Sequence, residues 1–220
     1  MGDLPAFAAS GRRMYHAGAI GAAVMTVHVV QGGDGLARRA FSADDVRRMI
    51  ESGIMQEDEP FELVEGELIF MNAQGFAHDR IKSALGRKLG RFLPERFFVG
   101  VEVSVQLTDH SIVQPDLVVG PDAAVVRTAE GFLSIPAAQI LLVAEVAAAS
   151  LAYDRGRKAA LYAREGVPEY WVIDANERTA WIHRNPGPSG YATVAEIPPH
   201  ERLEAAAPEL AGFGVRLEEL

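Results

Sequence analysis

The chain has 220 residues, of which 49% are hydrophobic and 23% charged, the balance of an ordinary soluble globular protein whose length allows a sizeable core. Its formal net charge of -9 argues against nonspecific wrapping of a polyanion, which relies on clustered lysine and arginine, but leaves room for a local basic groove. The absence of cysteine excludes disulfides and thiolate metal sites and suits a cytoplasmic protein.

The first part of the sequence is interpreted as a flexible extension, residues 1–40, ahead of a single domain, residues 41–220. Arg12 and Arg13 precede a small-residue apolar run, "AGAIGAAVMTVHVV", with a weak likeness to a signal peptide. The run is too short to span a bilayer, His28 interrupts it, and no convincing cleavage site follows. A disordered extension therefore explains this segment better than secretion does.

The domain is predicted to open with a helix and a β-hairpin. In "SADDVRRMIESG", Ser42 and Asp45 have capping-box spacing and Gly53 stands where a helix would end, which predicts a helix over about residues 43–52. Next, "FELVEGELIFMN" is typical of two short strands, with Gly66 supplying the turn between them.

The segment "HDRIKSALGRKLGRFL" predicts a long amphipathic helix. Its apolar residues fall in one stripe at helical period: Ile81, Leu85, Leu89 and Phe92. Arg80, Arg87 and Arg91 fall on another stripe. That second stripe is either an ordinary solvated face or a face that fronts a phosphate backbone.

Strands dominate the rest of the chain. "FFVGVEVSVQL", residues 97–107, alternates apolar and polar residues, as a half-buried strand does, whereas "SIVQPDLVVG" and "ILLVAEVAAAS" are apolar enough for burial on both faces. "YDRGRKAALYAREG" predicts a helix with Asp154 as its N-cap and Gly166 as its stop. "EYWVID" and "RTAWIHR" then form a hairpin, and "YATVAEI" adds a strand. This order predicts an α/β (α+β) fold in which helices pack on a mixed sheet.

Each of the two buried-strand runs carries one carboxylate, Asp116 after Pro115 in the first and Glu145 in the second. A proline inside a strand marks an edge or an irregularity that can re-aim a side chain. If the strands are neighbours, the acids lie about 5 Å apart and repel by roughly 3 kcal/mol at an effective dielectric of 20. A shared proton, a basic side chain or a divalent cation could offset this repulsion. Two carboxylates best suit Mg²⁺ or Mn²⁺.

Lys158 is the basic side chain that could approach these acids. It begins a helical stripe that continues through Leu161, Tyr162 and Glu165, on a helix that follows closely behind the Glu145 strand. The alternative is an ordinary surface ion pair with an acid four residues earlier on the same helix.

Four segments in order, "FELVEGEL", "QPDLVV", "LLVAEV" with "YDRGRKAALYAREGVPEYWVID", and "RTAWIHR", resemble the Uma family of putative restriction endonucleases in the PD-(D/E)xK phosphodiesterase superfamily. The likeness covers roughly residues 41–220, and "GVPEYWVID" is its most distinctive block. The resemblance implies a restriction-endonuclease-like core with a central mixed sheet flanked by helices, and a metal-dependent nuclease activity.

By this resemblance the catalytic residues are Asp116, Glu145 and Lys158. The two acids would hold the metal, and the lysine matches one that the family places on the helix instead of on the strand. The usual strand position, two residues after the glutamate, is Ala147 here. The lysine on the helix therefore has to replace it, or the site is inactive.

Two further positions match the family less closely. Glu62 aligns with a hairpin glutamate that could be an additional metal ligand, or it is simply an exposed strand residue. His78 matches a histidine that could contact phosphate or assist proton transfer, or it is structural. Ala148 and Ala149 stand where the family commonly has serine and proline, which puts efficient catalysis in question more than the fold.

The sequence thus predicts a cytoplasmic, Mg²⁺- or Mn²⁺-dependent endonuclease that hydrolyses DNA, with phosphate contacts from His78, Arg80, Arg87 and Arg91. The alternatives are a catalytically impaired scaffold that serves as a binding or assembly module, and a hydrolase of another phosphate ester. The aromatic strands "EYWVID" and "TAWIHR" suggest a homodimer formed through a sheet edge, with His183 at the surface or interface rather than a ligand.

Overall fold

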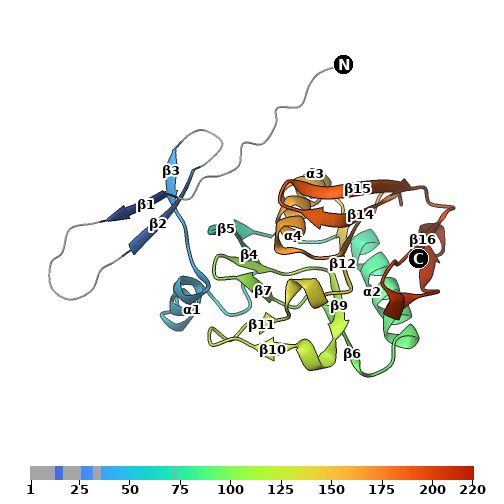
Figure 1. The fold of residues 1–220 in the computed structure, drawn as a ribbon, viewed down its shortest axis with the longest axis horizontal. Coiled ribbons are helices and arrows are strands. Elements are labelled where there is room, and N and C mark those ends of the chain that lie inside the picture. The colour runs from blue at the N-terminus through green and yellow to red at the C-terminus, as the bar shows by residue number, and fades with distance from the viewer. Residues whose placement is uncertain (1–12, 17–25, 32–35, 72) are drawn as a thin grey trace, which may run out of the picture.

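A computed structural model describes residues 13–16, 26–31, 36–71 and 73–220 of the chain. Two six-stranded sheets form the body of the domain (Figure 1). The first sheet has the order β10 (Val126–Arg127), β11 (Leu133–Ser134), β7 (Val105–Thr108), β8 (Ser111–Val113), β4 (Phe61–Val64) and β5 (Glu67–Phe70). The second has the order β15 (Gly190–Ile197), β14 (Ala180–Gly187), β13 (Glu169–Asp174), β12 (Leu142–Ala147), β9 (Leu117–Pro121) and β6 (Phe97–Val101).

The second sheet is mixed, as predicted, because β12 and β13 run parallel whereas the other pairs are antiparallel. All residues of β12 and β13 are buried, which agrees with the near-continuous apolar sequence of these strands. The predicted hairpin of β13 and β14 and the additional strand β15 are confirmed. Since β15 covers β14, neither β13 nor β14 is an edge, and the predicted pairing of two chains through these strands is wrong.

Four α-helical segments flank the sheets: α1 (Ala43–Glu51), α2 (Phe76–Phe92), α3 (Leu151–Tyr153) and α4 (Ala159–Glu165). A π-helical turn, Asp154–Lys158, joins α3 to α4. Short 3-10 turns lie at Asp122–Ala124, Ala137–Gln139, Pro208–Leu210 and Leu217–Glu219. None of the described helices is long and apolar enough to cross a membrane.

The helix boundaries follow local chemistry. The capping box of α1 is confirmed, since the Asp45 N–H donates to Ser42 Oγ at 3.1 Å and the Ser42 N–H donates to Asp45 Oδ2 at 3.0 Å. Gly166 ends α4 with a left-handed φ of 85°, also as predicted. The prediction that Asp154 is an N-cap is wrong, because the helix begins three residues earlier and Asp154 lies inside the π-helical turn.

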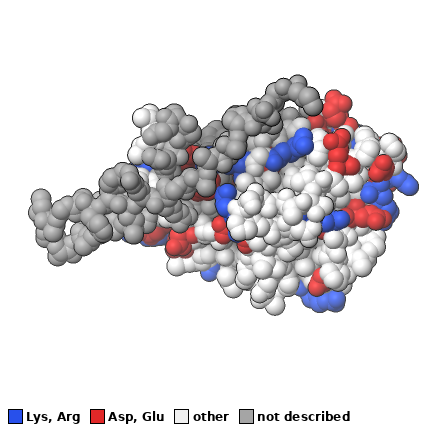
Figure 2. Space-filling view, turned by 45° about the horizontal axis from the view of Figure 1, so that its top comes forward, with Lys and Arg blue, Asp and Glu red and all other residues white. Residues whose placement is uncertain are grey.

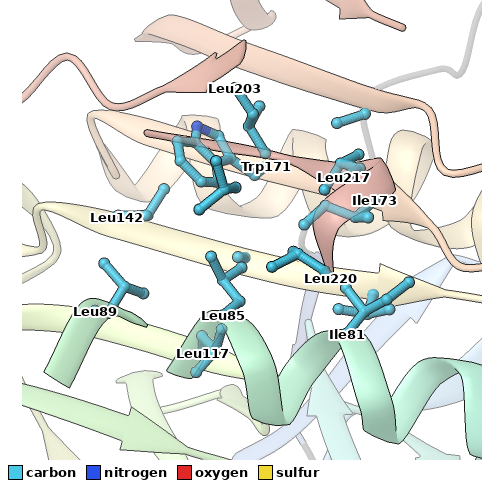
Figure 3. Close-up of a cluster of buried hydrophobic side chains, with 14 of the residues drawn as sticks. Ile81, Leu85, Leu89, Leu117, Leu142, Trp171, Ile173, Leu203, Leu217 and Leu220 are labelled. Atoms are coloured by element: carbon cyan, nitrogen blue, oxygen red, sulfur yellow. The ribbon is translucent and has the colours of Figure 1, made fainter. Parts of the chain in front are cut away.

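The two faces of the second sheet are covered by different helices. On one face, α2 and the C-terminal hairpin of β16 (Arg202–Glu204) and β17 (Gly214–Arg216) enclose the largest apolar cluster (Figure 3). Ile81, Leu85 and Leu89 of α2 are fully buried there against residues such as Trp171. On the other face, the helix that follows β12 packs Leu161 and Tyr162 against alternate residues of β12 and β13. The helix-flanked sheet predicted from sequence is therefore present.

The predicted strand over residues 97–107 is divided in the structure. Its first half is β6 in the second sheet and its second half is β7 in the first sheet. The break lies at Glu102, whose φ of 51° is left-handed and turns the chain from one sheet to the other. The run over residues 111–120 is divided in the same way, into β8 and β9, at the position where Pro115 predicted an irregularity. The two crossings lie side by side, because the Glu102 N–H donates to the Asp116 carbonyl at 3.2 Å.

Within the predicted N-terminal extension the structure contains three short antiparallel strands, β1 (Arg13–His16), β2 (Thr26–Gln31) and β3 (Ala37–Arg39). These strands were not predicted from the sequence. Most of the signal-peptide-like run, including residues 17–25, lies outside the described residues. The flexibility of residues 1–40 and the single domain over residues 41–220 stay predictions.

Candidate functional site

A pocket of about 330 Å³ opens where the chain crosses between the two sheets. Its walls come from β4, from the segment after β5, from the start of α2, from β12 and from the π-helical turn. Five predicted site residues line it, and each is at most 5% exposed: Glu62, His78, Asp116, Glu145 and Lys158. Residues that are up to 96 positions apart in the sequence are thus brought to one cavity.

Asp116 and Glu145 lie beside each other because β9 and β12 are antiparallel neighbours. The Asp116 N–H donates to Glu145 Oε2 at 3.4 Å, and Asp116 Oδ2 accepts a hydrogen bond from the Val146 N–H at 2.7 Å. Burial raises the pKa of Glu145 well above its ordinary value, and the charges of Asp116 and Asp154 raise it further, against the opposing effect of Lys158. The two acids therefore repel each other in a site that is withdrawn from water.

Lys158 lies between two of the acids. Its Nζ is 2.8 Å from Glu62 Oε1 and 2.6 Å from Glu145 Oε1. Burial lowers the pKa of Lys158, but Glu145 and Glu62 outweigh this effect and raise it well above the ordinary value, so the side chain stays charged. The alternative of an exposed surface pair is wrong, since Lys158 is 3% exposed.

Lys158 is the last residue of the π-helical turn. Such a turn adds a residue to the helical repeat and often marks a functional position. Ala147 belongs to the same apolar cluster as α4, so the face of β12 that carries Glu145 is the face that the helix covers. A lysine on the helix therefore approaches the same cavity that a lysine at position 147 would approach. This explains how a lysine on the helix could replace the lysine that is missing from the strand.

Glu62 is buried, 1% exposed, so the alternative of an exposed strand residue is wrong. Its Oε1 accepts hydrogen bonds from Lys158 Nζ and from the Gln114 N–H, the latter at 2.9 Å. This oxygen is therefore engaged in positioning the lysine. A role for Glu62 as a metal ligand stays a prediction.

His78 reaches the pocket from the first turn of α2. Its Nε2 is 3.0 Å from Asp116 Oδ2, and its Nδ1 is 3.4 Å from Asp79 Oδ1. Burial lowers the pKa of His78, but the hydrogen bond to Asp116 and the charge of that acid outweigh it, so the pKa is raised above the ordinary value. The histidine therefore holds one carboxylate oxygen in place. Its contact with phosphate and its part in proton transfer stay predictions.

The predicted arginine stripe is not part of the pocket. Arg80, Arg87 and Arg91 are exposed, none lines the cavity, and at 100° per residue they lie roughly half a turn around α2 from His78. Over the part of the chain that the structure describes, none of the three forms an ion pair. Their contact with a phosphate backbone stays a prediction, and it would have to occur on the outer side of the helix.

Sequence reasoning missed several polar neighbours of the site. Tyr162 donates its hydroxyl to Glu145 Oε1 at 3.2 Å, and the spacing of four residues from Lys158 could have indicated this. Asp154 is buried beside Lys158, and its Oδ2 accepts a hydrogen bond from Ser150 Oγ at 2.6 Å. Lys82, one turn after His78, pairs with Asp79 and with Glu102 across the crossing between the sheets. No local pattern distinguished Lys82 from the rest of the helix.

The charge balance of the pocket suits a hard divalent cation. Its acids outnumber its cations, which are one lysine and one histidine. These acids are all buried: Glu62, Asp116, Glu145 and Asp154. Among the described residues, no three histidine or acidic side chains are arranged to hold a metal by themselves. Mg²⁺ commonly binds through one or two carboxylates and keeps several waters, so a donor set of Asp116 and Glu145 fits this ion, whereas structural zinc sites usually use four ligands that include cysteine or histidine.

A known structure has a similar fold. A crystal structure of a putative nuclease belonging to DUF820 from Anabaena variabilis superposes with a TM-score of 0.65 at 18% sequence identity, covering 81% of this chain and 96% of that one. NucC from E. coli MS115-1, in its apo form, gives a TM-score of 0.27 at 20% identity, over 44% of this chain and 53% of that one, which is too low to support any argument. No curated protein matches the sequence.

The family assignment rests on the sequence itself. The Uma2 family, described as putative restriction endonuclease, matches residues 43–218, which is most of the chain. That range contains both sheets, the four helical segments and every residue of the pocket. The chain therefore belongs to the Uma2 family of putative restriction endonucleases.

Proposed function

We propose that this protein is a metal-dependent endonuclease that hydrolyses phosphodiester bonds in DNA. The observation that carries the proposal is the convergence of Asp116, Glu145 and Lys158 in one pocket whose buried acids outnumber its cations. Membership of the Uma2 family supports the nuclease class. The fold that the chain shares with a putative nuclease agrees with this class.

Asp116 and Glu145 are the residues that would hold Mg²⁺, or Mn²⁺ in its place. Such an ion, when bound, polarises a phosphate and makes water a better nucleophile at neutral pH. Its charge would also offset the repulsion between the two carboxylates. The Val146 N–H and His78 Nε2 fix Asp116 Oδ2, which keeps that carboxylate in one orientation.

Lys158 is the residue that would contact the reacting phosphate. Its ammonium group stabilises negative charge that develops on the phosphoryl oxygens, or orients the attacking water. Glu62 positions this lysine, and Tyr162 positions Glu145. The site is withdrawn from bulk water, which strengthens each of these electrostatic interactions.

The second candidate is a catalytically impaired scaffold that binds partners without cleaving DNA. Two observations favour it: Lys158 already neutralises Glu145 at 2.6 Å, and no group of three ligands exists among the described residues. Ala148 and Ala149, which stand in the family's serine and proline positions, line the pocket without any hydroxyl. Hydrolysis of another phosphate ester remains the third alternative.

Digestion of supercoiled and linear DNA with Mg²⁺ or Mn²⁺ tests the proposal. We expect nicking that EDTA abolishes and that Asp116→Asn reduces by at least about 100-fold, a typical effect of removing one catalytic charge. Asp122→Asn, an exposed acid outside the pocket, is the matched control and should cleave as the wild type does. Equal nicking by the wild type and Asp116→Asn would indicate a contaminant, and no Mn²⁺ binding in calorimetry would favour the scaffold.

Two further expectations belong to the proposal. We place the protein in the cytoplasm because a chain without cysteine suits a reducing compartment. A homodimer formed through an edge of the second sheet would have to use β15 or β6, since β13 and β14 lie inside the sheet. A monomeric mass in solution would remove the dimer from the proposal.

A further inference from the structure

Lys82 is a buried cation that the proposed mechanism does not use. Figure 2 shows exposed lysine and arginine side chains interspersed with acids over one face of the molecule. Among the lysines and arginines whose burial the structure describes, only Lys82 and Lys158 are buried, at 6% and 3% exposed. Lys158 belongs to the pocket, whereas Lys82 does not line it. Because burying a charge is costly unless partners compensate it, the position of Lys82 needs an explanation.

Lys82 donates hydrogen bonds to three side chains. Its Nζ is 3.0 Å from Asp79 Oδ1 and 3.2 Å from Gln74 Oε1, and it also donates to Glu102 Oε1. An ammonium group has three hydrogens, so none is left to contact a phosphate. The side chains of Asp79 and Glu102 are 54% and 44% exposed, and ion pairs with such exposed acids contribute little to stability. Lys82 therefore serves chiefly to hold these two acids in place.

Through Asp79, Lys82 reaches the carboxylate of Asp116. Asp79 Oδ1, which accepts the hydrogen bond from Lys82, also lies 3.4 Å from His78 Nδ1. The other nitrogen of that ring, His78 Nε2, is 3.0 Å from Asp116 Oδ2. His78 and Lys82 are four residues apart on α2, so they share one face of the helix. Lys82 therefore keeps Asp79 against the imidazole, and the imidazole in turn holds the carboxylate.

Through Glu102, Lys82 reaches the backbone of Asp116. Glu102 lies where the chain crosses from β6 to β7, and its φ of 51° is left-handed, a conformation that persists in such a residue only when its surroundings hold it. Its N–H donates to the Asp116 carbonyl at 3.2 Å, and its own carbonyl accepts a hydrogen bond from Gln114 Nε2 at 3.0 Å. The hydrogen bond from Lys82 to the Glu102 carboxylate is a further contact that stabilises this crossing.

We propose that Lys82 is a positioning residue for Asp116, which it fixes at two points, the carboxylate and the backbone carbonyl. This inference rests on the proposed function, in which Asp116 would hold a divalent cation. Removing a side chain that orients a metal ligand through hydrogen bonds typically lowers metal affinity by about 10–100-fold. Since Lys82 does not line the pocket, its removal should weaken metal binding and leave the chemical step nearly unchanged.

Calorimetric titration of the protein with Mn²⁺ tests this. Lys82→Met removes the charge but retains most of the apolar stem, and we expect it to weaken Mn²⁺ binding by about tenfold or more. In nicking assays the Mn²⁺ concentration that gives half the maximal rate should rise by a similar factor. The rate at saturating Mn²⁺ should stay within about threefold of the wild type. Lys88→Met, which changes an exposed lysine of the same helix, is the matched control and should alter neither quantity.

Three further variants separate positioning from a merely structural role. Asp79→Asn and Glu102→Gln each interrupt one of the two connections to Asp116, and they decide the question if Lys82→Met does not fold. Each should weaken Mn²⁺ binding by about threefold, less than the loss of the lysine that serves both connections. Lys82→Arg retains the charge and several donors, so it should bind Mn²⁺ more tightly than Lys82→Met does.

Equal Mn²⁺ affinity in the wild type and in the folded Lys82, Asp79 and Glu102 variants, whatever their stability, would overturn the inference. If Mn²⁺ binding and cleavage then still depended on Asp116, the proposed function would stand alone. A lower rate at saturating Mn²⁺ with unchanged affinity would also overturn it, because that result would place Lys82 at the reacting phosphate. Weakened Mn²⁺ binding in a protein that never cuts DNA would retain the inference and remove the nuclease. A wild-type protein that does not bind Mn²⁺ would end both.

Discussion

Glu145 in β12 and Glu169 at the start of the neighbouring strand β13 are both buried carboxylates, 5% and 2% exposed, but their surroundings differ. Glu169 Oε1 accepts hydrogen bonds from Trp171 Nε1 at 2.8 Å and from Arg184 at 2.7 Å, and its Oε2 accepts one from the Ala206 N–H at 2.7 Å. No other acid is among these partners, and Glu169 does not line the pocket.

Glu145 is less well satisfied. Its hydrogen bonds come from Tyr162 and, at the longer distance of 3.4 Å, from the Asp116 N–H, and it shares Lys158 with Glu62. A buried acid is therefore not by itself the sign of a functional site. What distinguishes the pocket is a surplus of acids over donors beside a cavity, since such a surplus costs stability unless a ligand offsets it.

The largest expected change in the free energy of unfolding comes from Lys158→Ala. Removing the cation leaves Glu62 and Glu145 buried without a charged partner, which should reduce the free energy of unfolding by about 3–5 kcal/mol. Urea denaturation measures this change. Lys88→Ala, on the exposed side of α2, is the control and should stay within about 0.5 kcal/mol of the wild type. A loss below about 1 kcal/mol would mean that the acids are largely protonated or hydrated in the pocket.

The same substitution in the two regions should have opposite effects. Glu145→Gln removes one of several repelling charges, so we expect unchanged or slightly higher stability, by up to about 1 kcal/mol, together with loss of DNA cleavage. Glu169→Gln replaces an acceptor of several donors and should cost about 1–3 kcal/mol without lowering the cleavage rate of the folded protein. Thermal unfolding and nicking assays on both variants check this pair. Equal destabilisation of the two would remove the distinction between the regions.

The free energy of unfolding should depend on pH through a buried histidine on the aromatic side of the sheet. His183 was expected at a surface or interface, but it is 4% exposed, with its ring 5.4 Å from that of Tyr170, and its Nδ1 is 3.3 Å from the Tyr170 carbonyl. Burial lowers the pKa of His183 below its ordinary 6.5, although backbone hydrogen bonds oppose this. The unfolded chain therefore binds the proton more readily, so stability falls as the pH decreases below about 6.5, by at most about 1.4 kcal/mol per pH unit.

His183→Gln should reduce this loss of stability between about pH 7.5 and about pH 5.5, as measured by urea unfolding at each pH. His200→Gln is the control, because His200 is exposed and should leave the pH dependence unchanged. An unchanged slope in His183→Gln would place the acid sensitivity elsewhere, for example in the carboxylates of the pocket.

The smallest effect is expected from replacing Arg80, Arg87 and Arg91 together by alanine. Since they lie on the outer side of α2, the triple variant should stay within about 0.5 kcal/mol in stability and within about twofold in cleavage rate. The dependence of DNA affinity on salt concentration is the sharper measurement. If the steepness of the plot of log binding constant against log salt concentration fell by about one for each arginine removed, the outer face of α2 would be shown to contact phosphates.

Much of the fold followed from local pattern. The capping box of α1, the apolar stripe of α2 and the buried strand β12 depend on residues close together in sequence, and the structure confirms them, except that Phe92 of the stripe is 42% exposed. The division of residues 97–107 between two sheets did not follow, because period-two alternation continues on both sides of Glu102 and its left-handed φ leaves no mark on the pattern.

The sequence by itself determined most of the elements, the two acids in apolar runs and the family likeness, because these depend on residue type and spacing. Only the tertiary structure decided that Glu62 positions Lys158, that His78 holds Asp116, and that the arginines face away from the pocket. Each of these depends on contacts between segments distant in sequence, and the direction of a side chain there is set by how whole sheets and helices pack rather than by its own neighbours.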